Sequence, residues 1–226
     1  MSGARITVAP RQLALALNHA ESFAREDFLA GPSNAAALSL IDRWPDWPDR
    51  VMALVGPEGS GKTHLASIWA AASGARVLSA KLLGRSDLPA ALATGALVLE
   101  DLEPGGLDER ALFHLLNLAR EEGAYLLITA RAAPVTFPVA IRDLGSRLRA
   151  LPVVTLAAPD DALLRALIVK LAADRQLGVD ETLVNYLTNR IERSFAAARA
   201  AVARLDEEAL RRQRPVTRAL AAELFR

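Results

Sequence analysis

The sequence predicts an α/β domain with a parallel sheet, followed by a small all-helical domain. Three observations support this fold class. Short apolar runs alternate with helical segments up to about residue 157, which is typical of a parallel sheet covered by helices on both faces. Beyond Pro159 only helical patterns follow. A glycine-rich stretch, GPEGSGKT, lies between the first apolar run and the helical segment after it.

Five short apolar runs predict the strands. The first is VMALV at 51–55, which ends at a glycine, and the others are at 76–79, 96–99, 125–129 and 153–156. Runs of this length bounded by turn residues are typical of buried strands. Between them, the spacing of apolar residues predicts helices at 64–73, 107–122 and 139–149, the first of which ends at Gly74.

The last part of the chain predicts four helices, at 160–177, 181–190, 194–212 and 217–225. Asp160 and Asp180 precede the first turns of two of them. They are suitable N-caps, because a carboxylate accepts hydrogen bonds from the free N–H groups of a first helical turn. We therefore expect a boundary between two domains at 158/159.

Composition restricts the class of protein. The 226 residues are 52% hydrophobic, enough for a sizeable core, and 27 basic residues nearly balance 26 acidic ones. This balance argues against a dedicated nucleic-acid binder. The absence of cysteine excludes disulfides and thiolate metal sites. No apolar run approaches the roughly 18 residues of a membrane helix, and the start lacks a signal-peptide layout, so we expect a cytoplasmic protein without a membrane span.

The stretch GPEGSGKT matches the phosphate-binding pattern G-x-x-x-x-G-K-[ST] in the strand–loop–helix context that the pattern requires. Its glycines let backbone N–H groups turn toward phosphates, Lys62 reaches the outer phosphates, and the Thr63 hydroxyl binds Mg²⁺. The alternative is a glycine-rich turn without a ligand. The predicted nucleotide-binding residues are Gly56, Pro57, Glu58, Gly59, Ser60, Gly61, Lys62 and Thr63, with His64 added by its position.

Several other side chains have simpler structural interpretations. His64 directly follows the motif, but a surface histidine on a helix is the simpler interpretation, and no role is assigned to it. Trp44, Trp47 and Trp69 are interpreted as packing residues rather than as a ligand-binding cage.

Two acidic residues, Glu100 and Asp101, end the run ALVLED. A carboxylate at the end of a strand near the phosphate loop holds Mg²⁺ through water, and an adjacent one orients the attacking water. We therefore predict that Glu100 binds the metal together with Thr63, and that the acidic pair takes part in catalysis. The alternative is an ordinary acidic loop at a strand end.

In this order, the phosphate loop, ALVLED, YLLITAR, GSR and the helical end resemble the AAA+ nucleotide-binding module, and more narrowly the modules of the replication initiator DnaA and its shorter regulatory relative Hda. The likeness extends from about residue 20 to the end. It implies an AAA+ P-loop domain at 21–158, a helical lid domain at 159–226, and binding of ADP or ATP with Mg²⁺. The segment EDFLAGPSN at 26–34 resembles the stretch that borders the adenine pocket in that family.

The resemblance also implies roles for three residues outside the loop. Thr129, at the end of YLLIT, lies at the family's first sensor position for the γ-phosphate, and Pro134 matches the prolines that follow it. GSRLR resembles the box that carries the arginine finger, which makes Arg147 the finger. IERSF resembles the second sensor, with Arg193 as its arginine. For each arginine, the alternative is a solvated surface residue.

Two departures from the DnaA pattern matter. That family carries two aspartates where this chain has Glu100 and Asp101. The changed side-chain lengths displace the metal and water contacts and disfavour fast hydrolysis, so we expect at most a weak ATPase. The chain also ends with the lid rather than with a helix-turn-helix domain, so we expect no direct sequence-specific DNA binding.

An uncharged stretch near the start, QLALAL at 12–17, has leucines at alternate positions. It is similar to the Q-L-x-L-x-L peptides that dock into the sliding clamp, the β subunit of DNA polymerase III. A flexible segment at 1–20 would supply these leucines to an apolar groove. The alternative is the first turns of an amphipathic helix. The predicted clamp-binding residues are Gln12, Leu13, Leu15 and Leu17.

Together these features predict a negative regulator of chromosomal replication initiation. On this interpretation the nucleotide-bound protein docks on the clamp and supplies Arg147 to the ATP bound by DnaA, whose hydrolysis it stimulates. The alternative is an AAA+ motor or helicase loader that works through its own ATP hydrolysis. In both cases the chain is a candidate homo-oligomer. A small-molecule kinase is disfavoured by the helical end and by GSR.

Overall fold

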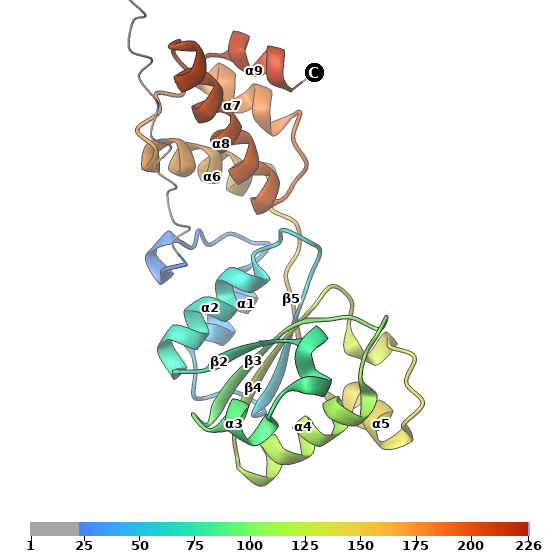
Figure 1. The fold of residues 1–226 in the computed structure, drawn as a ribbon. Coiled ribbons are helices and arrows are strands. Elements are labelled where there is room, and N and C mark those ends of the chain that lie inside the picture. Colours follow the sequence, from blue (N-terminus) through green and yellow to red (C-terminus); the bar gives the residue numbers. More distant parts are fainter. Residues whose placement is uncertain (1–22, 226) are drawn as a thin grey trace, which may run out of the picture.

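The computed structural model of the protein describes residues 23–225, so the clamp motif predicted at 12–17 lies outside the described residues. Within the described part, five strands form one parallel sheet in the order β2-β3-β4-β1-β5 (Figure 1). β1 pairs with β4 on one side and with β5 on the other. The predicted α/β fold with a parallel sheet is confirmed. The strands are β1 (Val51–Val55), β2 (Arg76–Ser79), β3 (Ala96–Leu102), β4 (Tyr125–Ala130) and β5 (Val153–Thr155).

Helices cover both faces of the sheet, because successive side chains of each strand alternate between the faces. In β1, Met52 and Leu54 pack into one core, and Ala53 and Val55 pack into the other. The first core is closed by α1 (Ala35–Asp42) and α2 (Lys62–Ser73). The second is closed by η2 (Ala80–Arg85), α3 (Leu88–Leu92), α4 (Glu109–Glu121) and α5 (Arg142–Ala150).

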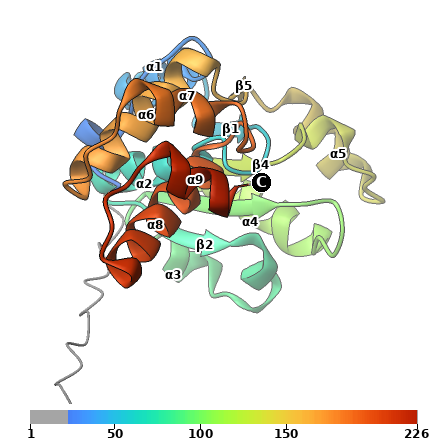
Figure 2. The same ribbon diagram turned by 90° about the horizontal axis from the view of Figure 1, so that it is seen from above.

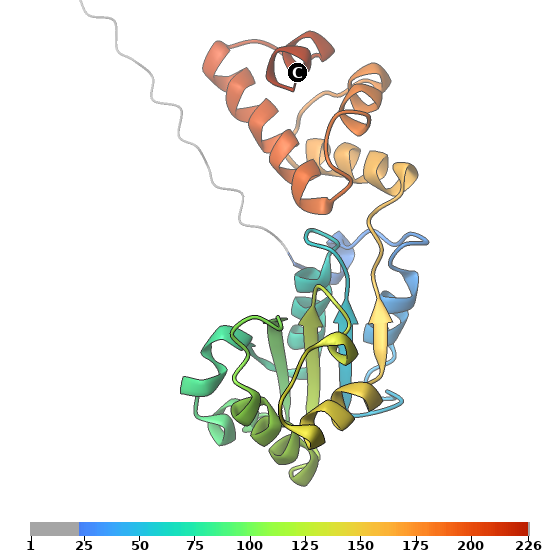
Figure 3. The same ribbon diagram turned by 90° about the vertical axis from the view of Figure 1, so that its right-hand side faces the viewer.

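The chain after β5 forms a helical lid. Its helices pack around an apolar core of their own, to which Leu164, Leu183 and Leu205 contribute. Figures 1 and 3 show the lid beyond the carboxyl ends of the strands, and Figure 2 shows it from above. The predicted boundary at 158/159 falls between β5 and α6. The lid helices are α6 (Asp161–Asp174), α7 (Glu181–Thr188), α8 (Phe195–Arg212) and α9 (Arg218–Leu224).

Side-chain caps fix the start of each lid helix. Asp160, Asp180, Ser194 and Thr217 each accept a hydrogen bond from the backbone N–H three residues further on. This satisfies one of the free N–H groups of the first turn and is worth about 1 kcal/mol per helix. The two predicted aspartate caps are confirmed, and every lid helix begins within one residue of its predicted start.

The helix predicted at 139–149 begins later, at Arg142. The Glu109 carboxylate on α4 accepts the N–H groups of Ala140 and Ile141 at 2.9–3.0 Å. These N–H groups are satisfied by Glu109 rather than by helical carbonyls, so the helix does not begin until residue 142. Two short helices, α1 and α3, are absent from the sequence prediction, because each is shorter than three turns and gives little periodicity.

Aromatic packing closes the face covered by α1 and α2. Trp69 on α2 is fully buried and stacks on Trp47, with their ring centroids 4.9 Å apart. Trp44 meets Tyr125 edge-on. These contacts confirm that the three tryptophans are packing residues. In residues 23–225, no helix is both long and apolar enough to cross a membrane.

Candidate functional site

The phosphate-binding pattern forms the loop between β1 and α2. β1 ends at Val55, and α2 begins at Lys62. Gly59 and Gly61 have φ values of 69° and 97°, in the left-handed region that glycine enters without a steric penalty. The loop therefore leads directly into the N-terminus of α2, where free N–H groups and the helix dipole favour an anion.

Lys62 is buried inside this loop. Only 7% of the residue is exposed, and its Nζ donates to the carbonyl oxygens of Gly56 and Pro57, both at 2.8 Å. Burial lowers the pKa of Lys62, whereas the nearby Asp101 carboxylate raises it. A buried ammonium held by neutral carbonyl oxygens is only partly compensated, so the loop is suited to an anionic ligand.

A second buried polar group, the Ser60 hydroxyl, lies on the inner side of the loop. The Ser60 hydroxyl is buried and has no hydrogen-bond partner among residues 23–225. Such orphaned atoms are rare, because an unpaired buried hydroxyl costs about 1–3 kcal/mol. Its Oγ lies 2.8 Å from the position of a Cβ on Gly56, on the inner side of the loop, so the close packing there requires glycine at position 56. The left-handed glycines and the buried Lys62 of this loop fit the phosphates of a nucleotide.

The two predicted metal ligands lie together. The Thr63 side chain lies close enough to the Glu100 carboxylate, which is on β3, to lower its pKa. Burial raises the pKa of Glu100, and the Thr63 contact opposes that shift. A hydroxyl and a carboxylate fit Mg²⁺ that arrives with phosphates, which provide further oxygen ligands. In the described part of the chain, no group of three or more His, Cys, Asp or Glu side chains is arranged to hold a metal alone.

Asp101 has a left-handed backbone that Thr129 supports. Its φ is 56°, and its N–H donates to the Thr129 Oγ1 at 3.0 Å. The register of β3 against β4 shifts between Leu99 and Leu102, so the acidic pair lies on an irregular stretch of the strand that re-aims its side chains. Thr129 is 1% exposed. The structure thus shows Thr129 holding Asp101, and its sensor role stays a prediction.

The lid contacts the phosphate loop through the start of α8. The Phe195 N–H donates to the Gly59 carbonyl at 2.8 Å. Ser194 packs so closely that a Cβ added to Gly59 would lie 2.8 Å from the Ser194 Cβ. Arg193, the predicted second sensor, precedes this contact and pairs with Asp161 at 2.9 Å. The fold therefore brings Arg193 next to the residues that touch the loop, although its sensor role stays a prediction.

Two phenylalanines form a wall beside the loop. Phe28 and Phe195 are stacked with their ring centroids 6.4 Å apart, and both rings lie within 4.0 Å of the position of a Cβ on Gly61. Phe28 belongs to the segment predicted to border the adenine pocket. Phe195 is missed by sequence patterns, because it lies at the start of a helix far along the chain and only the fold brings it to the loop.

His64 is not the surface residue that the sequence predicts. It is half-buried, and its ring meets those of Phe23 and Phe28 edge-on, at centroid distances of 5.3 and 5.2 Å. Its Nε2 lies 3.1 Å from the Ala24 carbonyl oxygen, and burial lowers its pKa. The surface interpretation is wrong because the chain at 23–28 packs against the start of α2, a contact between distant segments that the sequence pattern does not show.

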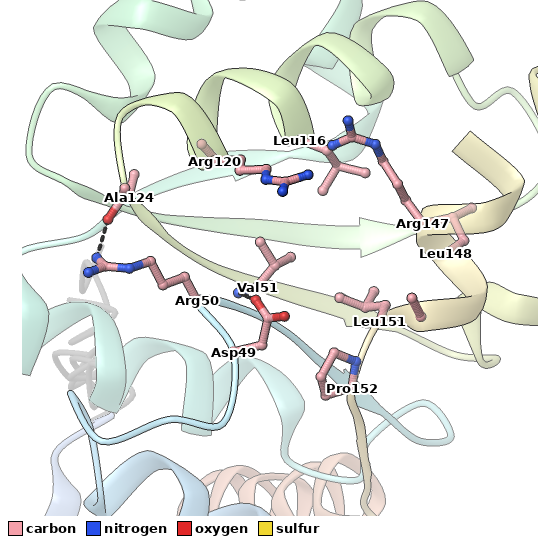
Figure 4. A pocket seen from close by; sticks show the side chains of 13 residues that line it. Asp49, Arg50, Val51, Leu116, Arg120, Ala124, Arg147, Leu148, Leu151 and Pro152 are labelled. Carbon is pink, nitrogen blue, oxygen red and sulfur yellow. Dashed lines mark hydrogen bonds between the residues drawn. The ribbon is translucent and has the colours of Figure 1, made fainter. Parts of the chain in front are cut away.

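Arg147, the predicted arginine finger, lies at the opposite edge of the sheet, in the last turn of α5. Its Nη2 donates to the Asn117 Oδ1 at 2.5 Å, and its guanidinium lies over the Phe113 ring at 5.2 Å. Figure 4 shows it at a cavity of about 430 Å³ that Arg50, Arg120 and the amino ends of β1, β4 and β5 also line. The five residues of β1 separate this edge from the phosphate loop by about 16 Å.

Comparison with known proteins identifies the fold. No family model matches the chain, and no curated protein matches it. Domain III of DnaA from Thermotoga maritima is 19% identical with a TM-score of 0.71, over 89% of this chain and 95% of that one. AMPPCP-bound DnaA from Aquifex aeolicus is 18% identical with a TM-score of 0.64, over 83% and 68%. A mutant of RuvB from T. maritima is 19% identical with a TM-score of 0.65, over 83% and 65%. The chain therefore has the fold of the AAA+ P-loop domains of DnaA and RuvB.

Proposed function

We propose that the protein is a nucleotide-dependent regulator that stimulates hydrolysis of the ATP bound by DnaA and thereby restrains chromosomal replication initiation. The observation that carries the proposal is the separation of its two functional charges. Lys62 lies at the carboxyl edge of the sheet and Arg147 at the amino edge. An arginine at the edge opposite its own phosphate loop, with the length of β1 between the two edges, is placed to act on a nucleotide bound by a neighbouring protein.

The protein's own nucleotide, ADP or ATP, binds at the loop of residues 56–63. Lys62 leaves the loop carbonyls to contact the outer phosphates. Thr63 and Glu100 would hold Mg²⁺. When bound, the ion neutralises charge on the phosphates. The acidic pair Glu100 and Asp101 would support at most weak hydrolysis by this chain.

Arg147 acts on the ATP of DnaA as an arginine finger. A finger supplied by a neighbour stabilises the charge that develops on the γ-phosphate, an effect of about 10³–10⁵ in rate for GTPases. Phe113 and Asn117 fix the direction of the guanidinium before the partner arrives. Support for DnaA as the neighbour comes from the shared fold and from the sequence motifs, which resemble those of the regulatory relative Hda.

Docking on the DNA-loaded sliding clamp belongs to the same proposal. It rests on the similarity of residues 12–17 to clamp-binding peptides, and it would concentrate the protein where DnaA is to be inactivated. The protein is accordingly proposed to act in the cytoplasm, where DnaA and the clamp are found.

The test is hydrolysis of DnaA-bound ATP, measured with and without this protein and the DNA-loaded clamp. We expect stimulation by the wild type and its loss in Arg147→Ala. Arg147→Lys should not restore it, because an ammonium lacks the planar fork of a guanidinium. Arg149→Ala is the matched control, since Arg149 is an exposed arginine in the same helical turn. No stimulation by the wild type, or normal stimulation by Arg147→Ala, would refute the proposal.

A second candidate is an ATP-hydrolysing motor or helicase loader that works as its own oligomer. The likeness to RuvB favours it, because its TM-score of 0.65 is close to the 0.64 for the nucleotide-bound DnaA. Turnover of ATP by the isolated protein separates the two candidates. A motor hydrolyses ATP repeatedly without DnaA and clamp, whereas the regulator scarcely does so.

A further inference from the structure

Arg131 bridges two acidic residues across the mouth of the phosphate loop. It directly follows β4, whose last residue accepts a hydrogen bond from the Gly56 N–H at 3.1 Å. The Arg131 Nη2 lies 2.9 Å from the Glu58 Oε2 in the loop, and its Nε lies 3.4 Å from the Glu103 Oε1 just after β3. The guanidinium therefore spans the space between the loop and the strand that carries the acidic pair.

Arg131 can readily leave Glu58 and Glu103 to bind another partner. The side chains of Arg131, Glu58 and Glu103 are 55%, 74% and 38% exposed, and ion pairs at such positions are weak because water screens the charges. The guanidinium also lies close enough to Lys62 to lower its pKa. Because a guanidinium binds two phosphate oxygens at once, a phosphate that reaches beyond Lys62 competes effectively for it.

The other polar side chain at the end of β4 is already engaged. Thr129 is buried, and its Oγ1 accepts the N–H of Asp101. Arg131 is exposed and carries a charge opposite to that of a phosphate. Of these two side chains, Arg131 is therefore the one suited to meet the end of a bound nucleotide.

We infer that Arg131 distinguishes a nucleoside triphosphate from a diphosphate at this site. With a diphosphate bound, Lys62 and the loop hold both phosphates, and Arg131 stays between Glu58 and Glu103. With a triphosphate bound, the guanidinium leaves the two carboxylates and binds the terminal phosphate. The inference rests on the proposed nucleotide site, and it assigns the triphosphate preference to a residue to which the sequence analysis gives no role.

Binding of ADP and of a non-hydrolysable ATP analogue, each with Mg²⁺, is to be measured by calorimetry for the wild type and Arg131→Gln. We expect Arg131→Gln to lower the affinity for the ATP analogue roughly ten- to a hundredfold. The affinity for ADP should change less than about threefold. Arg131→Lys should retain part of the preference, because it keeps the charge without the fork. The exposed Arg110→Gln on α4 is the matched control for loss of one surface arginine.

Glu103→Gln is a second test, and it changes a residue outside the phosphate loop. It removes one carboxylate that competes for Arg131, so the affinity ratio of analogue to ADP should rise by up to about fivefold. The same change should leave the ratio unaltered in an Arg131→Gln background.

The outcomes separate the inference from the proposed function. If the wild type binds neither nucleotide, both are overturned. The second outcome is that the wild type binds both nucleotides and that Arg131→Gln lowers the two affinities equally or not at all. Arg131 then merely offsets the charge of Glu58 and Glu103. In that case the discriminating role is overturned, while the nucleotide site stands.

Discussion

The two edges of the sheet hold their cationic side chains in different ways. At the carboxyl edge, Lys62 is bound by backbone carbonyls of a loop whose shape depends on Gly59 and Gly61. At the amino edge, Arg147 is bound by the side chains of Asn117 and Phe113 on another helix. A site made by a continuous loop is recognisable in the sequence together with its contacts. For Arg147 the sequence motif indicates the residue, but the partners that hold it, Asn117 and Phe113, become visible only in the fold.

The largest expected effect tests the carboxyl edge. Lys62→Ala removes a charge-assisted phosphate contact worth about 1.5–3 kcal/mol, so ADP affinity should fall roughly ten- to 150-fold by calorimetry. Lys81→Ala is the matched control, because Lys81 is an exposed lysine on η2. If Lys62→Ala binds ADP as tightly as the wild type, the carboxyl edge is not a phosphate site and the contrast between the edges fails.

The next effect concerns the contact between the loop and the lid. Gly59→Ala places a Cβ in the left-handed region, at about 1–2 kcal/mol, and also against Ser194. Gly95→Ala carries a similar backbone cost at φ 75°, but its Cβ meets no atom of the described structure within 4 Å. We expect Gly59→Ala to lower the free energy of unfolding in urea by about 1 kcal/mol more than Gly95→Ala.

Hydrogen exchange locates that effect. In Gly59→Ala the Phe195 amide should lose protection, because its acceptor is the Gly59 carbonyl. Equal unfolding free energies for the two glycine variants, with Phe195 still protected, would show that the lid does not depend on this contact.

A smaller effect tests the amino edge. Asn117→Ala removes the hydrogen bond that orients Arg147 but leaves the guanidinium in place. Loss of one such bond, at about 0.5–1.5 kcal/mol, should reduce stimulation of DnaA-bound ATP hydrolysis roughly two- to tenfold, with unchanged ADP affinity. His114→Ala, at an exposed position of the same helix, serves as the control. Full stimulation by Asn117→Ala would mean that the partner, rather than Asn117, orients the finger.

The smallest effect is a pH dependence at the carboxyl edge. Burial holds the pKa of His64 below its ordinary value of 6.5. The unfolded chain therefore binds a proton more readily than the folded one, and stability falls as the pH decreases below about 6.5. In urea unfolding at pH 7.5 and 5.5, His64→Phe should lose part of this dependence, whereas His114→Gln should keep it. An unchanged dependence in His64→Phe would exclude His64 as its source.

Much of the fold can be predicted from the sequence because its elements depend on local patterns. The buried parallel strands are short apolar runs, and the lid helices begin at capping side chains such as Asp160 and Asp180. β3 continues beyond its predicted end, because tertiary contacts from Thr129 support the charged residue Asp101 within the strand. Helix α5 starts late for a similar reason, since Glu109 binds the backbone before it.

The candidate site is predictable only where it is continuous. The phosphate loop is a single stretch, and Thr63 and Glu100 can be paired because each comes near the carboxyl end of a strand of one parallel sheet. The wall formed by Phe28 and Phe195 and the bridge made by Arg131 join residues from separate elements. Their spacing along the chain carries no information about these contacts, so only the folded structure reveals them.

Ser194 performs two tasks at one position. Its hydroxyl accepts the Ala197 N–H and caps α8, while its Cβ packs on Gly59. Aspartate or asparagine would preserve the cap but bring a bulkier group against the loop, and alanine would fit the loop but remove the cap. The lid and the phosphate loop therefore cannot diverge independently in evolution. Among relatives of this chain, positions 59 and 194 are expected to change together. A larger side chain at one position should occur only with a smaller side chain at the other.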